Sequence, residues 1–231
     1  MNLFSEFGDI VGSRAAPYQE TEKLVRRRRI IVGVVLVIGA VLLGFSLTRE
    51  PGDASFYGLT LALAGVWAAG ARLSGPVHFG HVEFRSKNRR PILTGTIIGL
   101  SLGAAFIVGG LVAREIPPVR DYIVQVLEYT NYGPIFLVTF ITLINGLAEE
   151  MFFRGALYSA LGKFRPVLIS TIVYAIAVSA AGNPMLGFAG LILGYVCAYE
   201  RRMTGGVLAP MLTHFFWGLV MVLALPVIFG V

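Results

Sequence analysis

Long apolar stretches are the feature that most constrains how this chain can fold. They recur from residue 30 to the C-terminus, and most are long enough to cross the roughly 30 Å hydrocarbon core of a bilayer. Hydrophobic residues make up 56% of the 231-residue chain and charged residues only 14%, whereas soluble domains carry about 25% charged residues. The sequence predicts an all-α fold, a polytopic transmembrane helical bundle over residues 30–231, preceded by a cytoplasmic tail over residues 1–29.

The apolar stretches predict about seven membrane-spanning helices. The fifth and sixth are short and are separated by only a few residues around Gly182, which indicates a tight helical hairpin or a partly re-entrant pair. Six spans are therefore an alternative. The stretches lie at residues 30–47, 56–73, 92–113, 134–161, 166–181, 185–199 and 207–229.

The positions of lysine and arginine predict the orientation, because the cytoplasmic loops of membrane proteins are enriched in both. With the N-terminus inside, fifteen of the nineteen basic residues are cytoplasmic, and only Arg49, Arg114 and Arg120 lie outside. The last one, Arg154, falls within a span. Seven spans then give an N-in, C-out topology. We expect a multi-pass protein of a bacterial plasma membrane, in contact with the lipid bilayer and with no nucleic-acid partner.

The tail carries apolar side chains at helical spacing, which predicts a short interfacial helix, with a disordered tail as the alternative. The basic run from Arg26 to Arg29 precedes the first span and is interpreted as its topology determinant rather than as a nucleic-acid signal. The apolar residues of the tail are Leu3, Phe4, Phe7, Ile10 and Val11.

Glycines recur every four residues in the third expected span, at Gly95, Gly99 and Gly103. This spacing places them on one stripe of the helix, where a neighbouring backbone can approach closely. Gly190 and Gly194 repeat the spacing in the sixth span. We interpret both as helix packing within the chain, with a dimer interface as the alternative.

Two adjacent glutamates and an arginine, Glu149, Glu150 and Arg154, lie within the expected span 134–161. Each charge in the middle of a membrane helix costs at least about 2.5 kcal/mol, so these residues require compensation. Glu150 and Arg154 are four residues apart on one helix face and are expected to form an ion pair. Glu149 points about 100° away and lacks that partner, which makes it a candidate general acid or base.

A second polar side chain, His214, lies in the last expected span among Phe215, Phe216 and Trp217. If the fourth span ends near residue 161 and the last begins near residue 207, His214 and the glutamates lie at similar depths below the cytoplasmic surface. We expect the imidazole to supply the partner that Glu149 lacks, in a water-filled pocket. The alternatives are glutamates that only join helices and a histidine that bonds a backbone carbonyl.

The string EEMFFRG, which begins at Glu149, resembles the EExxxR motif of the CPBP family of intramembrane proteases. That family includes the CAAX prenyl endopeptidases and bacteriocin-processing or immunity proteins. The segments YERRMTGG and VLAPMLTHFFWG resemble the stretch that precedes and contains its HxxxN-type motif, and the resemblance covers residues 134–220. It implies one catalytic set: the carboxylates Glu149 and Glu150, Arg154 to orient them, and His214 as the histidine of the third motif.

Two positions depart from the family pattern. The second motif, FxxxH, would fall on Tyr174 to Val178, and the asparagine of the third motif would fall on Gly218. A two-histidine metal site cannot be assembled from these positions, and the single Cys197 excludes a thiolate zinc site. The remaining candidate ligands for a divalent metal such as zinc are Glu149, Glu150 and His214.

The residues and the resemblance together predict an intramembrane endopeptidase, which hydrolyses a peptide or membrane-protein substrate near the cytoplasmic side of the bilayer. A glutamate would activate water, and His214 would stabilise the oxyanion or protonate the leaving nitrogen. Asn145, one turn before Glu149, and Tyr174 are auxiliary candidates, as donors of an amide and a hydroxyl hydrogen.

Two other functions stay open at this point. A catalytically inactive membrane scaffold or immunity protein would explain the missing histidine and asparagine. A small transporter would use the glutamates and His214 as a proton relay. A protease requires these side chains to line a cavity that water reaches, whereas a scaffold would pack them dry against Arg154. No residue identifies the substrate or a pocket for an isoprenoid.

Overall fold

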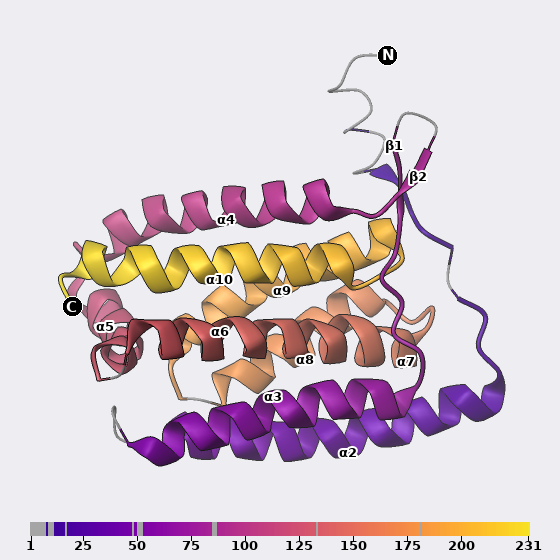
Figure 1. The fold of residues 1–231 in the computed structure, drawn as a ribbon, viewed down its shortest axis with the longest axis horizontal. Helices are drawn as coiled ribbons and strands as arrows, with labels where there is room; N and C mark the ends of the chain where they lie inside the picture. Colours follow the sequence, from indigo (N-terminus) through magenta and orange to yellow (C-terminus); the bar gives the residue numbers. More distant parts are fainter. Residues whose placement is uncertain are drawn as a thin grey trace.

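Helices make up about 80% of the computed structural model, and most of them follow the predicted apolar stretches. They pack side by side into an elongated bundle, with a small β-hairpin at one end (Figure 1). The predicted all-α membrane bundle is therefore confirmed. The structure describes residues 8, 12–16, 18–47, 49, 53–84, 87–132, 134–180 and 182–231.

Among the described residues, five helices are long and apolar enough to cross a membrane. The two short predicted spans correspond to α8 (Pro166–Ser179), which is apolar but shorter, and α9 (Pro184–Thr204), which ends in a basic turn. A count of seven spans therefore stays a prediction. The five are α2 (Glu22–Leu47), α3 (Ala54–Ser74), α4 (Ile92–Ala113), the run Ile135–Leu161, and α10 (Leu208–Phe229).

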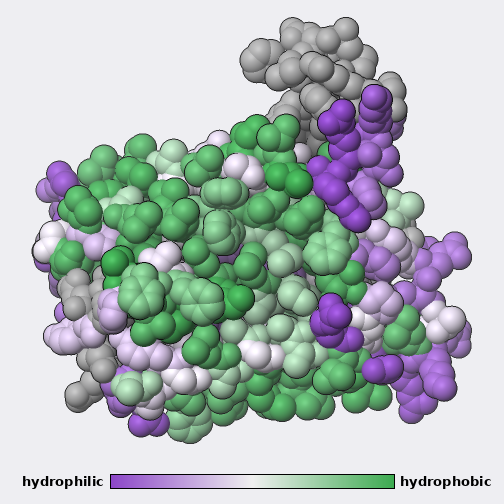
Figure 2. Space-filling model, viewed as in Figure 1, coloured by the Kyte–Doolittle hydropathy of each residue, from purple (hydrophilic) through white to green (hydrophobic). Residues whose placement is uncertain are grey.

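The chain runs back and forth along the bundle, so that the start of α2 and the C-terminus lie at opposite ends (Figure 1). Hydrophilic residues gather at the end that carries the hairpin of β1 (Val82–Phe84) and β2 (Lys87–Arg89), whereas the middle of the molecule is mostly apolar (Figure 2). This distribution fits a bundle embedded in lipid. The N-in, C-out orientation itself stays a prediction.

The first helix begins earlier than expected. Because α2 starts at Glu22, the basic run is helical rather than part of an extended tail. The guanidinium of Arg28 is fully buried and donates hydrogen bonds to the Glu20 carboxylate, the Ser74 hydroxyl and the Pro76 carbonyl, which stabilises the first turns. The predicted interfacial helix, with Leu3, Phe4, Phe7, Ile10 and Val11, lies outside the described residues.

Two elements were not expected from the sequence. The hairpin is short, and α5 (Pro117–Asn131) is an amphipathic helix that packs against α6, α9 and α10. Neither has the long uniform hydropathy by which membrane spans are recognised, because the hairpin strands have three residues each and α5 is polar on one side. The hydropathy pattern alone therefore treats both as loops.

The glycine stripe of α4 lies directly against α10. A Cβ atom on Gly95 would come within 2.9 Å of the Ala209 Cα, and one on Gly99 within 2.9 Å of the Thr213 Cα. The interpretation of this stripe as packing within the chain is confirmed. Because the two backbones are in contact, α4 holds α10, and with it His214, at a fixed depth in the bundle.

Candidate active site

The helix that carries the two glutamates changes its hydrogen-bonding pattern at the site. The α-helix α6 (Ile135–Glu150) ends at the second glutamate, and the chain continues without a break as the π-helix η1 (Met151–Leu157) and then α7 (Tyr158–Leu161). π-helical turns are rare in proteins and often occur at functional sites. The glutamates thus lie at the end of α6, with Arg154 one turn later in η1.

The predicted ion pair between Glu150 and Arg154 is present. Arg154 Nη1 donates a hydrogen bond of 2.8 Å to Glu150 Oε1, and both side chains are 0% exposed. The second guanidinium nitrogen, Nη2, donates to the carbonyl of Gly194 on α9 at 3.0 Å. The guanidinium carbon lies 4.5 Å from the centre of the Tyr174 ring. Arg154 therefore neutralises Glu150 and also ties η1 to its neighbours.

His214 of α10 contacts Glu150 rather than Glu149, against the prediction. Its Nδ1 atom lies 2.9 Å from Glu150 Oε1. The absence of a side chain at Gly146 of α6 makes this possible, because a Cβ atom there would lie 2.9 Å from His214 Cδ2. An ionised carboxylate only accepts hydrogen bonds, so we assign the hydrogen on Nδ1 to this contact. The other ring nitrogen, Nε2, is then left for a reacting group.

Glu149 has a partner that the helix geometry did not predict. Its Oε2 atom accepts a hydrogen bond of 2.7 Å from the hydroxyl of Tyr174 on α8. The side chain is half-buried, in contrast to the sealed Glu150. Of the two auxiliary candidates, the structure thus brings Tyr174 into the site. Asn145 instead donates its amide to the carbonyl of Ile141 in its own helix at 2.9 Å.

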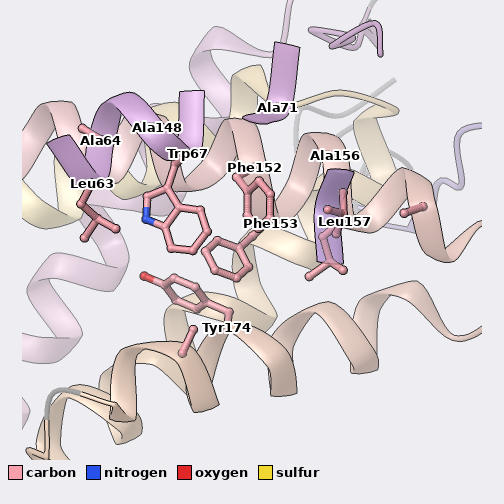
Figure 3. Close-up of a cluster of buried hydrophobic side chains, with 13 residues drawn as sticks. Leu63, Ala64, Trp67, Ala71, Ala148, Phe152, Phe153, Ala156, Leu157 and Tyr174 are labelled. Carbon is pink, nitrogen blue, oxygen red and sulfur yellow. The ribbon is translucent and has the colours of Figure 1, made fainter. Parts of the chain in front are cut away.

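An aromatic cluster fixes the position of Tyr174 (Figure 3). Trp67 of α3 lies over Phe152 and Phe153 of η1, with ring centres 4.6 and 5.1 Å apart, and Phe153 meets Tyr174 edge to face at 4.9 Å. Such contacts stabilise by about 0.5–1.5 kcal/mol beyond the area that they bury. The π-helical turn therefore presents two adjacent phenylalanines to the same cluster and orients the tyrosine hydroxyl.

The candidate metal ligands are not arranged as a metal site. Within the described part of the chain, no group of three or more His, Cys, Asp and Glu side chains is placed to hold a metal ion. Glu150 Oε1 already lies within hydrogen-bond distance of both Arg154 and His214, so a cation bound there would adjoin a guanidinium. The set Glu149, Glu150 and His214 does not fit a metal in this arrangement.

The sequence analysis missed one buried carboxyl group near the site. Glu200 of α9 is 1% exposed, and its Oε1 atom lies 2.8 Å from the hydroxyl of Thr213, the residue before His214. It falls at the edge of the span 185–199, next to Arg201 and Arg202, where the pattern predicts a solvated charge. Its position on an apolar helix between two membrane segments was the available signal.

Comparison with known families agrees with this location of the site. Residues 131–220 match the family model of the type II CAAX prenyl endopeptidases, described as Rce1-like, over less than half of the chain. The resemblance stated from the motifs is confirmed over that segment, which holds α6 to the middle of α10. No curated protein and no solved structure matched the chain in the same comparisons.

Proposed function

We propose that this protein is an intramembrane endopeptidase in which Glu149 activates water and His214 stabilises the oxyanion that forms. The observation that carries the proposal is the meeting of four elements, α6, η1, α8 and α10, through polar side chains in an apolar bundle. The Rce1-like match over the same residues supports a protease. The excess of basic residues in the expected cytoplasmic loops supports a site that opens toward the cytoplasm.

Glu149 is the residue best suited to act as the general base. Its side chain is partly exposed, and among the described residues its bonded partner is the hydroxyl of Tyr174 rather than a cation. Tyr174 occupies its Oε2 atom and leaves Oε1 for the attacking water. A carboxylate in an apolar site is a stronger base than one in water, because desolvation disfavours its ionised form.

Glu150 has a different task, which is to orient His214. Its charge is neutralised by Arg154, and its Oε1 atom accepts from Nδ1 of the imidazole. A fixed acceptor at one ring nitrogen sets which way the other nitrogen points, and both nitrogens of a doubly protonated ring donate. Nε2 can then donate a hydrogen bond to a substrate carbonyl.

The reaction balances with these groups alone. Glu149 takes a proton from water while the water oxygen bonds to the peptide carbonyl carbon, and the resulting oxyanion accepts from His214 Nε2. When the carbon–nitrogen bond breaks, the proton held by Glu149 passes to the leaving nitrogen. The products are a carboxylate and an amine, and Glu149 is regenerated. No metal takes part in these steps.

The proposal is tested with the purified chain in liposomes and a library of fluorogenic peptides with an apolar anchor. Glu149→Gln keeps an acceptor for Tyr174 but removes the base, and we expect it to lower the cleavage rate by a factor of about 10² to 10⁴. The matched control is Glu115→Gln, in the exposed turn after α4, where the side chain is 71% exposed. Equal cleavage by both variants would remove Glu149 from the role.

A catalytically silent scaffold is the second candidate. It is favoured by the complete burial of Glu150 and Arg154 and by the apolar residues at the two departing motif positions, Val178 and Gly218. A scaffold predicts that no peptide of the library is cleaved by the wild-type chain. It also predicts that Glu149→Gln leaves partner binding unchanged.

A further inference from the structure

Glu200 is a buried acid that the proposed reaction does not use. It lies on α9 and faces α10 at Thr213, the residue before His214. Its Oε1 atom is 2.8 Å from Thr213 Oγ1. Its second oxygen, Oε2, has no hydrogen-bond partner among the described residues, although the side chain is 1% exposed. An ionised carboxylate placed this way would keep only one hydrogen bond.

The hydroxyl of Thr213 has two acceptors within reach and one hydrogen to give. Thr213 Oγ1 lies 3.0 Å from the carbonyl oxygen of Gly95 on α4 and 2.8 Å from Glu200 Oε1. A threonine hydroxyl donates once and accepts otherwise. If Thr213 donates to Gly95, then Glu200 must donate to Thr213, and an acid that donates carries a proton.

The charges around Glu200 also favour the neutral acid. Glu150 and Arg154 are the charged groups that face it from α6 and η1, and Arg154 is already bonded to Glu150. On its own helix, Arg201 directs Nε to the Arg154 carbonyl at 2.9 Å. An isolated buried carboxylate without a counterion is strongly disfavoured.

The hollow beside Glu200 has no basic side chain among the described residues that line it. A hollow of about 140 Å³ lies between α4 and α9, and the residues that line it with Glu200 are apolar or tyrosine. The buried Oε2 atom does not open onto this hollow, so a solvated cation does not reach it from there. The other lining residues are Ile98, Tyr195, Val196, Tyr199 and Met203.

We propose that Glu200 is a protonated carboxylic acid that donates to Thr213 and thereby acts as a positioning residue for His214. The chain of hydrogen bonds from Glu200 through Thr213 to the Gly95 carbonyl joins α9, α10 and α4. It fixes the rotation and the depth of α10 one residue before the imidazole. The protonation of Glu200 stands on its own geometry, whereas its effect on catalysis rests on the proposed function.

Infrared difference spectroscopy tests the protonation without any substrate. The spectrum of wild-type protein minus that of Glu200→Gln should contain the carbonyl stretch of a protonated carboxylic acid, between about pH 6 and pH 8, where an ordinary glutamate is ionised. Glu149→Gln, measured in parallel, assigns any band that Glu149 contributes. A difference spectrum that contains only carboxylate bands would overturn the proposal.

Cleavage measurements on the same proteins test the positioning role. Glu200→Ala should lower the cleavage rate by about a hundredfold, as expected for a displaced catalytic group, while Glu200→Gln, whose amide can donate to Thr213, should cleave at close to the wild-type rate. The same comparison is made at Thr213. Thr213→Ser keeps the hydroxyl and should cleave at close to the wild-type rate, whereas Thr213→Val lacks the hydroxyl and should cleave more slowly.

The outcomes separate the two claims. Cleavage by Glu200→Ala at the wild-type rate, or equal losses in Glu200→Ala and Glu200→Gln, would overturn the positioning role. A wild-type chain that cleaves nothing would instead overturn the proposed function, and the infrared result would still decide the protonation state of Glu200.

Discussion

Two adjacent glutamates in one helix occupy opposite environments. Glu150 is sealed from solvent, neutralised by Arg154 and bonded to His214, whereas Glu149 is half-buried and bonded to the neutral hydroxyl of Tyr174. The region around Glu150 is thus an ionic junction between helices, whereas Glu149, within the described part of the chain, is bonded to a hydroxyl and not to a cation.

A membrane helix can therefore hold two adjacent carboxylates in different environments and for different purposes. The acid bonded to Arg154 and His214 joins α6, η1 and α10, whereas the acid bonded only to a hydroxyl keeps an oxygen for another partner. A turn of 100° between successive residues is enough to separate the two environments. Substitutions at Arg154 or Gly146 disturb the surroundings of Glu150, and a substitution at Tyr174 disturbs those of Glu149.

The largest effect is expected from Arg154→Leu, which removes the cation of the sealed region. The variant leaves the charge of Glu150 buried without its partner, which costs about 3–5 kcal/mol of folding free energy. Thermal or denaturant unfolding in detergent measures the loss. The matched control is Arg72→Leu on the exposed face of α3. Equal stability of the two variants would show that the ion pair does not hold the bundle together.

Gly146→Ala should separate stability from activity in the same region. The added Cβ atom would meet the end of the His214 side chain at 2.9 Å, so the imidazole turns away from Glu150 and the backbone stays in place. The lost charged hydrogen bond corresponds to about 1.5–3 kcal/mol. Because each 1.36 kcal/mol changes a rate about tenfold, the cleavage rate should fall by roughly ten- to a hundredfold.

The control for this substitution is Gly65→Ala on α3, where an added Cβ atom meets nothing within 4 Å. A Gly146→Ala chain that is strongly destabilised, or that cleaves as fast as the control, would contradict the packing of His214 on Gly146.

The smallest of the three effects is expected from Tyr174→Phe, which changes only the surroundings of Glu149. The ring stays in the aromatic cluster, and the hydrogen bond to Glu149 Oε2 is lost. One hydrogen bond of this kind contributes about 0.5–1.5 kcal/mol, so the cleavage rate should fall by about two- to tenfold and the unfolding temperature should change little. Tyr195→Phe, at an exposed position of α9, is the control. An unchanged rate would remove Tyr174 from the site.

Much of the fold could be predicted because hydropathy is a local property. Each of the five long apolar helices overlaps a predicted stretch, since a span of lipid demands a continuous run of apolar side chains. The ion pair of Glu150 with Arg154 followed from helical spacing in the same way. The packing of Gly95 and Gly99 on α10 followed from the size of glycine alone.

The rest depended on contacts between distant segments. The preference of His214 for Glu150 is set by the rotation of α10 against α6, and no spacing in the sequence encodes that angle. The partner of Glu149 is a tyrosine on α8, held by rings from η1 and α3. Glu200 was missed because its burial arises only when α4, α9 and α10 meet.

The most direct test of the unequal glutamates is chemical modification with a hydrophobic carbodiimide, which reacts with the carboxyl groups that it can reach. Tandem mass spectrometry of the peptide that contains both residues locates the adduct. The account predicts modification of Glu149 and none of Glu150, because only Glu149 is partly exposed. Modification of both residues to the same extent, of Glu150 alone, or of neither would contradict it.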